Sequence, residues 1–310
     1  GACRMSSLFA FPGQGAQQEG MLQRLPDGGG LLLEEASDTL GQAALALDSR
    51  VALQSTRAVQ LCLLLSGVAW ARWLMQRSPA PAYVAGLSIG AYPAAVTAGA
   101  LGFADAVRLV ALRGELMQCA YPQGYGMTAL SGLDLVSVER LLSEVGGEVF
   151  VANLNSDNQI VIAGSDTAMA AVAARARRQG QGVARRLAVS VPSHCPLLAG
   201  PAAELASAFA TVELRRPRIT YLSGSSARPV FDPQRLRDDL AGNMARLVDW
   251  RATLRNAFER GVRLHLEIPP GNVLSGLARA VFEQGRVVAV EGTRWDTLDA
   301  LLRQEVADDR

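Results

Sequence analysis

An uncharged stretch at residues 78–104 limits what this chain can fold into more than any other feature. It contains no Asp, Glu, Lys or Arg, and it is long enough to span a bilayer as a helix. Prolines and glycines interrupt it at Pro79, Pro81, Gly86, Gly90, Pro93, Gly99 and Gly102. Because these residues punctuate secondary structure, the pattern predicts a buried strand, a turn and a helix in the core of a soluble protein, with no membrane partner.

The turn in this stretch reads Gly86-Leu87-Ser88-Ile89-Gly90, between an apolar strand and an alanine-rich helix. A strand, G-x-S-x-G and a helix in this order form a nucleophile elbow, in which the tight turn presents the serine hydroxyl at the edge of the sheet. The start of the helix offers the Ile89 N–H to a developing oxyanion. A Gly/Ser turn is also common without catalysis, so the pentapeptide alone leaves both interpretations of Ser88 open.

A serine nucleophile needs a base, and the chain has two histidines. His194 lies in a loop between Pro192 and Pro196, an unusual place for a packing histidine. His265 lies in the predicted strand 262–268, whose alternate apolar residues share the opposite face, so we expect it to be a structural residue of a sheet. The 30 basic residues are all arginines, which excludes lysine nucleophiles and the Walker phosphate loop.

Three further side chains have both a chemical and a structural interpretation. Gln14, in the glycine-rich turn 11–15 after a strand, is either part of a simple turn or an amide donor to an oxyanion. Arg113 is an isolated cation in an apolar helix, either ion-paired or available to bind a carboxylate. Cys195 is adjacent to His194, and we expect it to be structural because free cysteines are usually buried.

The overall composition excludes several classes of protein. Thirty basic against 29 acidic residues give a net charge of +1, so no global field favours nucleic acid or an anionic membrane. The four cysteines show no C-x-x-C spacing, which argues against a zinc site or a disulfide framework. With no signal-peptide pattern visible, we expect a reducing cytoplasm.

The order of predicted elements indicates an α/β protein of two domains. Strands at 7–15 and 83–88 flank a helix at 55–76, which predicts a parallel sheet covered on both faces. From residue 126 the order becomes β-α-β-β-α-β, which is the ferredoxin-like unit. We therefore expect a large domain at 1–124 and 191–310, an inserted small domain at 125–190, and a cleft between them.

Several motifs together resemble the malonyl-CoA:acyl-carrier-protein transacylases, in that family's order and over nearly the whole chain. They are Phe11-Pro12-Gly13-Gln14-Gly15, the Gly86 to Gly90 elbow, Leu112-Arg113-Gly114, NQIVIAG at 158–164, VSVPSHC at 189–195, Val248-Asp249-Trp250, and EIPPGNVLSGL at 267–277. The resemblance implies an α/β-hydrolase-like large domain with a ferredoxin-like insertion. Several motifs in register are far more specific than any one of them.

The resemblance also implies a role for each site residue. Ser88 is the acyl-accepting nucleophile and His194 its base. Gln14 and the Ile89 N–H form the oxyanion hole, and Arg113 binds the malonyl carboxylate. A backbone carbonyl at Asp249 orients the histidine, and the acyl pocket is lined by Gln60, Met117 and Asn155. Malonyl-CoA is the substrate, the phosphopantetheine-type arm of an acyl carrier protein is the acceptor, and no metal or redox cofactor is needed.

Two positions depart from the family's usual elbow, which reads G-H-S-x-G-E. Leu87 replaces the histidine and Ala91 the glutamate. The elbow looks more like that of the transacylase subunit of bacterial malonate decarboxylase, called epsilon or H, which implies the other subunits of that enzyme as partners. The alternative is malonyl supply to fatty-acid or polyketide synthesis. Two alternatives differ in activity. One is a thioesterase, and the other is a catalytically silent subunit that only docks a carrier.

A group of arginines on the predicted small domain is a candidate docking surface for the carrier. The group consists of Arg175, Arg177, Arg178, Arg185 and Arg186. Carrier proteins are generally acidic, so a basic rim beside the cleft would steer their approach. The alternative is an ordinary solvated face of charged side chains.

Overall fold

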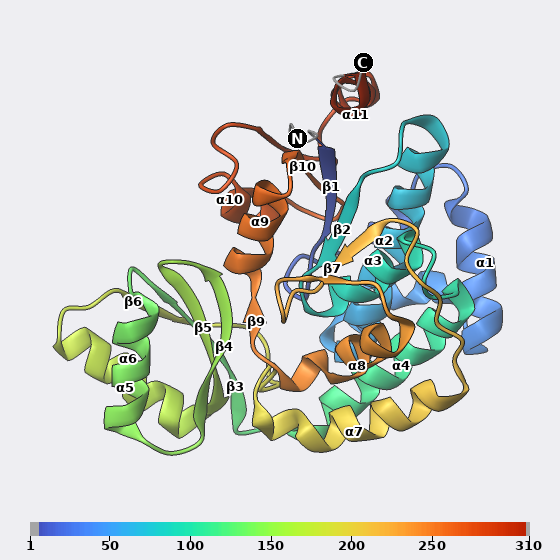
Figure 1. Cartoon of the computed structure of the whole chain (residues 1–310). Coiled ribbons are helices and arrows are strands. Elements are labelled where there is room, and N and C mark those ends of the chain that lie inside the picture. Colours follow the sequence, from blue (N-terminus) through green and yellow to red (C-terminus); the bar gives the residue numbers. More distant parts are fainter. Residues whose placement is uncertain (1–5, 308–310) are drawn as a thin grey trace.

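The computed structural model describes residues 6–307, and its larger sheet is mixed rather than wholly parallel (Figure 1). The strand order is β11-β10-β1-β2-β7-β8. Five strands run parallel: β1 (Ser6–Phe11), β2 (Tyr83–Gly86), β7 (Thr220–Leu222), β10 (Val262–Glu267) and β11 (Arg286–Ala289). The edge strand β8 (Pro229–Val230) is antiparallel to β7. The predicted parallel sheet is therefore correct except for this edge.

Helices cover both faces of the larger sheet, as its apolar strands require. The helices of this part of the chain are α1 (Gly29–Leu40), α2 (Thr56–Arg77), α3 (Ala91–Thr97), α4 (Phe103–Ala120), α7 (Ala199–Ala208), α8 (Pro233–Gly242), α9 (Trp250–Glu259), α10 (Val273–Ala278) and α11 (Trp295–Ala307). Of these, α1 and α7 pack on other helices rather than on the sheet. In β1, Phe9 and Phe11 pack in the cluster that contains α2 to α4. The alternate residues Leu8 and Ala10 pack with α9 and α10 on the other face.

The uncharged stretch folds as predicted, into β2, a tight turn, α3 and the start of α4. Its strand residues Val84 and Ala85 are fully buried. Among the described residues, only α2 is long and apolar enough to cross a bilayer, and 78% of its most apolar window is buried inside the protein. That burial is typical of a core helix.

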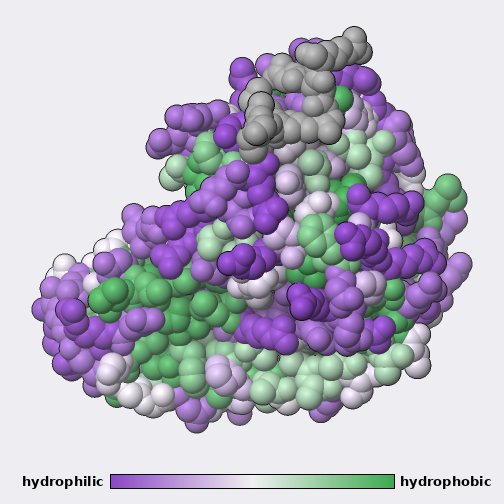
Figure 2. Space-filling model, in the orientation of Figure 1, coloured by the Kyte–Doolittle hydropathy of each residue, from purple (hydrophilic) through white to green (hydrophobic). Residues whose placement is uncertain are grey.

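The second sheet is built from the predicted β-α-β-β-α-β order. Its elements are β3 (Tyr125–Ser131), α5 (Leu135–Val145), β4 (Val149–Ser156), β5 (Gln159–Ser165), α6 (Asp166–Arg178) and β6 (Val183–Arg186). One face packs on α5 and α6. The other face carries a smaller apolar cluster that includes Met127, Ala152 and Val161. In the space-filling view, hydrophobic surface gathers over the β3 to β5 region (Figure 2).

A fifth strand joins this sheet from a later part of the chain. The sheet order is β6-β3-β5-β4-β9, and β9 (Val248–Asp249) runs parallel to β4 (Figure 1). This short strand lies directly before α9, which begins only at Trp250. The Asp249 side chain accepts a hydrogen bond from the Ala252 N–H, and this N-cap makes α9 begin at Trp250. The two residues before it are free to pair with β4.

Candidate active site

Ser88 lies on the tight turn between β2 and α3, where its backbone adopts φ +58°, in the left-handed region. The flanking glycines make this turn possible. A Cβ at Gly86 would lie 1.9 Å from the Gly90 carbonyl carbon, and one at Gly90 would lie 2.2 Å from the Phe11 oxygen. The sequence predicted this geometry, and only glycine fits at both positions.

His194 lies next to the serine hydroxyl. Its Nε2 is 2.8 Å from Ser88 Oγ, and its Nδ1 is 2.8 Å from the Asn243 carbonyl oxygen. A carbonyl can only accept, so Nδ1 carries the proton and Nε2 presents its lone pair to the hydroxyl. The two groups therefore have the relation of a base and the nucleophile that it activates.

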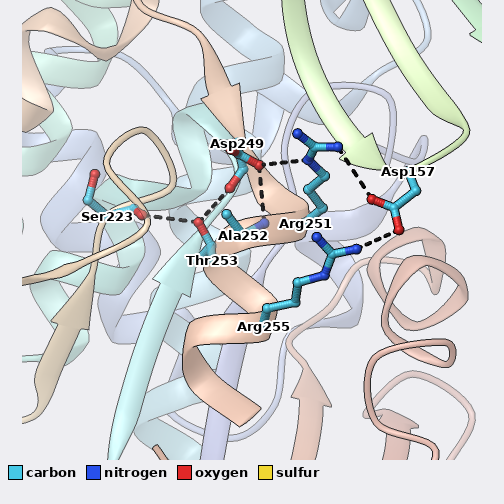
Figure 3. A network of polar contacts seen from close by, with 7 residues as sticks. All are labelled: Asp157, Ser223, Asp249, Arg251, Ala252, Thr253 and Arg255. Carbon is cyan, nitrogen blue, oxygen red and sulfur yellow. Dashed lines mark hydrogen bonds and ion pairs between the residues drawn. The ribbon is translucent and has the colours of Figure 1, made fainter. Parts of the chain in front are cut away.

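The carbonyl that orients the histidine belongs to Asn243, which corrects the expectation for Asp249. The Asp249 carbonyl accepts from Thr253 Oγ1 at 2.8 Å, and its side chain caps α9 through Ala252 (Figure 3). Both the carbonyl and the side chain of Asp249 thus accept hydrogen bonds from residues of α9. Asn243, in the short 3-10 helix Asn243–Ala245 after α8, places its carbonyl opposite the imidazole.

The surroundings of His194 keep its imidazole neutral. Burial, together with the Arg113 cation, lowers the pKa of His194 from 6.5 to about 4. The hydrogen bond to the Asn243 backbone acts in the opposite direction but is a smaller effect. At neutral pH the ring is therefore unprotonated and able to accept a proton from Ser88.

Arg113, on α4, is fully buried directly behind the serine. Its Nη1 donates to Gln60 Oε1 and its Nη2 to Asn243 Oδ1, each at 2.9 Å, and Nη2 lies 3.4 Å from Ser88 Oγ. Its Nε has no hydrogen-bond partner, and no described acidic side chain forms an ion pair with it. Burial lowers the pKa of this guanidinium. The structure thus holds a buried cation without a counter-ion.

A cavity of about 550 Å³ gathers most of the predicted residues. It is bounded by the loop after β1, the elbow, the β3 to β6 sheet and the start of α10. The predicted residues in its lining are Gln14, Gln60, Ser88, Ile89, Met117, Asn155, Arg185 and His194. Arg113 lies behind Ser88, and Asp249 lies outside the lining. The cavity therefore places the Ser88 hydroxyl, the His194 imidazole and the Gln14 amide around one space.

The comparisons with known proteins agree with this geometry. The acyl transferase domain family matches residues 8–304. The chain belongs to this acyltransferase family. It is 37% identical over 285 residues to the malonyl CoA-acyl carrier protein transacylase of Salmonella typhimurium, covering 89% of this chain and 92% of that protein.

Solved structures give the same result for the fold of the acyltransferase. FabD from Acinetobacter baumannii superposes with a TM-score of 0.90 at 36% identity, covering 99% of this chain and all of that one. A malonyl-transacylase in complex with its type II PKS acyl-carrier protein superposes at 0.88 with 35% identity, covering 96% and 99%. The chain is therefore an acyltransferase with the α/β fold and mixed sheets of these enzymes.

His265 and Cys195, the second histidine of the acyltransferase and the thiol beside His194, both lie in the packed interior. His265 is fully buried in β10, 5.6 Å from the Phe282 ring, and neither ring nitrogen has a described partner. Cys195 donates from its thiol to the Pro192 carbonyl, and burial raises its pKa to about 11. Neither side chain lines the cavity that holds Ser88, so neither is placed to act there as a base or nucleophile. Within residues 6–307, no cluster of three or more His, Cys, Asp or Glu could hold a metal ion.

The five arginines proposed for carrier docking do not share one environment. Arg175 pairs with Glu144 at 2.5 Å, and Arg186 with Asp166 at 2.7 Å. Arg177 and Arg178 are exposed at the end of α6, and Arg185 alone of the five lines the cavity. Neighbouring strand residues point to opposite faces, which separates Arg185 from Arg186.

Sequence reasoning missed three polar residues of the site. Asn243 bonds both His194 and Arg113, and no motif around it marked this role. Asn153 and Gln159 line the cavity beside Asn155, and the Oδ1 atoms of both asparagines are buried without a partner. The alternation of Asn153 and Asn155 along β4 was the available signal, because residues i and i+2 of a strand share a face.

Proposed function

We propose that this acyltransferase moves a malonyl group from malonyl-CoA to the phosphopantetheine thiol of an acyl carrier protein, through a malonyl ester on Ser88. The observation that carries the proposal is the buried, unneutralised Arg113, 3.4 Å from Ser88 Oγ. An acyl group that ends in a carboxylate supplies the missing negative charge at this place. The relatives named above support the same substrates.

In the first half-reaction, His194 Nε2 takes the proton of Ser88 as Oγ attacks the thioester carbonyl. Negative charge develops on the carbonyl oxygen, and the Ile89 N–H and the Gln14 amide stabilise it. The tetrahedral intermediate then collapses, the carbon–sulfur bond breaks, and the imidazolium returns its proton to the leaving CoA thiolate. In the second half-reaction the carrier thiol gives its proton to His194 and its sulfur attacks the malonyl ester. The tetrahedral intermediate collapses, the bond from the acyl carbon to Ser88 Oγ breaks, and the imidazolium returns the proton to Oγ.

The lining of the cavity suits the pantetheine arm, which malonyl-CoA and the malonyl carrier protein share. That arm contains amide N–H donors, and Asn153 and Asn155 present buried, unpartnered oxygens. Gln60 and Met117 hydrogen-bond to each other at 3.3 Å beside the acyl end. No step requires a metal or redox cofactor, in line with the chemistry of a serine acyltransferase.

Supply of malonyl groups to fatty-acid or polyketide synthesis is the better supported pathway. The relatives named above are malonyl CoA-acyl carrier protein transacylases, including one solved with a type II PKS carrier. The assignment to malonate decarboxylase, with its other subunits as partners, rests only on Leu87 and Ala91 in the elbow. Transfer to a fatty-acid carrier, compared with transfer to a carrier bearing a dephospho-CoA-derived arm, separates the two.

The domain arrangement belongs to the same proposal. We assign residues 125–190 to a ferredoxin-like small domain, and residues 1–124 and 191–310 to an α/β-hydrolase-like large domain. The β6-β3-β5-β4 order with two helices on one face supports the first assignment, although β9 shows that the large domain also contributes to that sheet. A cytoplasmic location and docking of the carrier near Arg185 complete the proposal.

The mass of the intact protein tests the proposed chemistry. Incubation with malonyl-CoA is expected to add one malonyl group to the wild type and none to Ser88→Ala, with acetyl-CoA as the comparison acyl donor. A thioesterase would release free malonate faster than it transfers malonyl to a carrier. A subunit that only docks a carrier would gain no mass, and this result would end the proposal.

A further inference from the structure

The turn between β4 and β5 is held to helix α9 by a cluster of charges that lies outside the catalytic residues (Figure 3). Asp157 Oδ2 lies 2.5 Å from Arg255 Nη2, and its Oδ1 lies 3.3 Å from Arg251 Nη1. Arg251 Nε is also 3.5 Å from Asp249 Oδ1. We call Asp157, Arg251 and Arg255 the hairpin clamp, because both arginines come from α9 and the carboxylate comes from the hairpin.

The hairpin that the clamp holds forms the polar wall of the cavity. Asn155 and Gln159 both line the cavity, and they bond each other at 3.3 Å across the two strands. Each lies two residues from Asp157. A shift of the turn therefore moves the oxygens and amides that face the substrate arm.

The strand pairing is interrupted close to this wall. The pairing of β4 with β5 is irregular between Val151 and Asn153 and again between Leu154 and Ser156. Such bulges redirect side chains and interrupt the ladder of hydrogen bonds. On the outer side, β9 pairs with β4 only at Asn153 and Leu154. The clamp supplies a second attachment three residues further along, at the turn itself.

We propose that Asp157 is a positioning residue for substrate binding: through Arg251 and Arg255 it fixes the β4–β5 hairpin to α9 and so keeps Asn155 and Gln159 at the place where they meet the pantetheine arm. This inference rests on the proposed function. It assigns no contact with substrate to Asp157 itself. When the Asp157 carboxylate loses its charge, substrate binding should weaken while the chemistry at Ser88 stays intact.

The test compares Asp157→Asn, Asp157→Glu and a control, Glu213→Gln. Glu213 forms an exposed ion pair with Arg215 away from the cavity lining, so its variant makes the same change of charge. For Asp157→Asn we expect the KM for malonyl-CoA to rise about two- to fivefold at low salt with kcat unchanged, the range of a partly exposed ion-pair network. Asp157→Glu should restore most of the affinity, and the KM ratio of variant to wild type should fall toward one as KCl is raised.

Hydrogen–deuterium exchange gives a readout that does not depend on activity. Amides of residues 153–161 should exchange faster in Asp157→Asn than in the wild type, and the Glu213→Gln protein should match the wild type. An unchanged KM, or a fall in kcat without a rise in KM, overturns the inference, as does faster exchange with normal KM. Malonylation of Ser88 in the wild type is measured alongside, because its absence would refute the proposed function rather than the clamp.

Discussion

Arg113 Nη2 lies 3.4 Å from Ser88 Oγ, so the cation of this site lies directly behind the hydroxyl that is proposed to carry the acyl group. The same guanidinium donates to Gln60 and to the Asn243 side chain, and the Asn243 backbone carbonyl accepts a hydrogen bond from His194 Nδ1. One asparagine thus links the proposed acyl-recognition residue to the proposed base. The residues proposed for substrate selection and for proton transfer therefore belong to one network of hydrogen bonds.

Arg113→Ala is expected to reduce kcat/KM for malonyl-CoA much more than for acetyl-CoA. Only the malonyl group offers a carboxylate, and losing a buried charged partner costs on the order of 2–4 kcal/mol, or tens to hundreds of fold. Measuring both kcat/KM values in a variant with wild-type thermal stability checks this. Equal losses for the two donors would make Arg113 a structural residue.

His194→Ala is expected to slow both half-reactions by a factor on the order of 10² to 10⁴, the range for loss of a positioned general base. Rapid-quench measurement of Ser88 malonylation and of transfer to the carrier follows each half-reaction. His265→Leu serves as the matched control and should retain near-normal rates. The reverse pattern would assign the base to His265.

The pH dependence of acylation should reflect the low pKa of His194. Because the neutral imidazole is the active form and its pKa is about 4, kcat/KM should stay level from pH 8 to pH 5 and fall as pH drops through about 4. An ordinary histidine would give the fall near pH 6.5. Single-turnover acylation in buffers of constant ionic strength distinguishes the two profiles.

His265 should make the fold sensitive to mild acid. Burial lowers its pKa to about 4, so between the unfolded value of 6.5 and about 4 the unfolded chain binds the proton and the folded one does not. Stability is therefore full above pH 6.5 and falls below it, with a contribution from His265 of about 2 kcal/mol between pH 7 and pH 5. Urea unfolding of His265→Leu at the two pH values should show a smaller loss than the wild type, and an equal loss would contradict this assignment.

Arg185 and Arg186 should respond differently to charge reversal. Arg185 lines the cavity, whereas Arg186 is paired with Asp166. Arg185→Glu is expected to slow transfer to an acidic carrier several-fold at low salt while Ser88 acylation stays nearly normal. Arg186→Glu, the matched control, should change carrier kinetics less. If neither variant alters carrier kinetics at low salt, the docking surface lies elsewhere.

The sequence predicted those parts of the site that depend on local chain geometry. The elbow around Ser88 needs only its two glycines, and His194 followed from the presence of just two histidines in the chain. Arg113 was recognised because a charge in an apolar helix is conspicuous. The order of elements from residue 126 onward was likewise predicted, since apolar periodicity and turn residues mark each strand and helix.

The parts that escaped prediction depend on contacts between distant segments. The carbonyl opposite His194 is a backbone atom of Asn243, and any residue type can provide one, so the sequence holds no signal for it. The two-residue strand β9 exists because β4 lies beside it. Likewise, the ion pair of Asp157 with Arg255 joins residues 98 positions apart, and nothing local marks that pairing.

The backbone at both proposed reacting residues has a consequence for how this enzyme responds to selection in the laboratory. Ser88 has φ +58° and His194 has φ +64°, conformations that cost non-glycine residues about 1–3 kcal/mol each. Glycine relieves that strain at Ser88 while removing the nucleophile, whereas at His194 it would also remove a buried, hydrogen-bonded ring and leave a cavity. A library screened only for expression or heat tolerance would therefore favour inactive proteins at Ser88, and stabilising this protein by selection needs a turnover assay at every round.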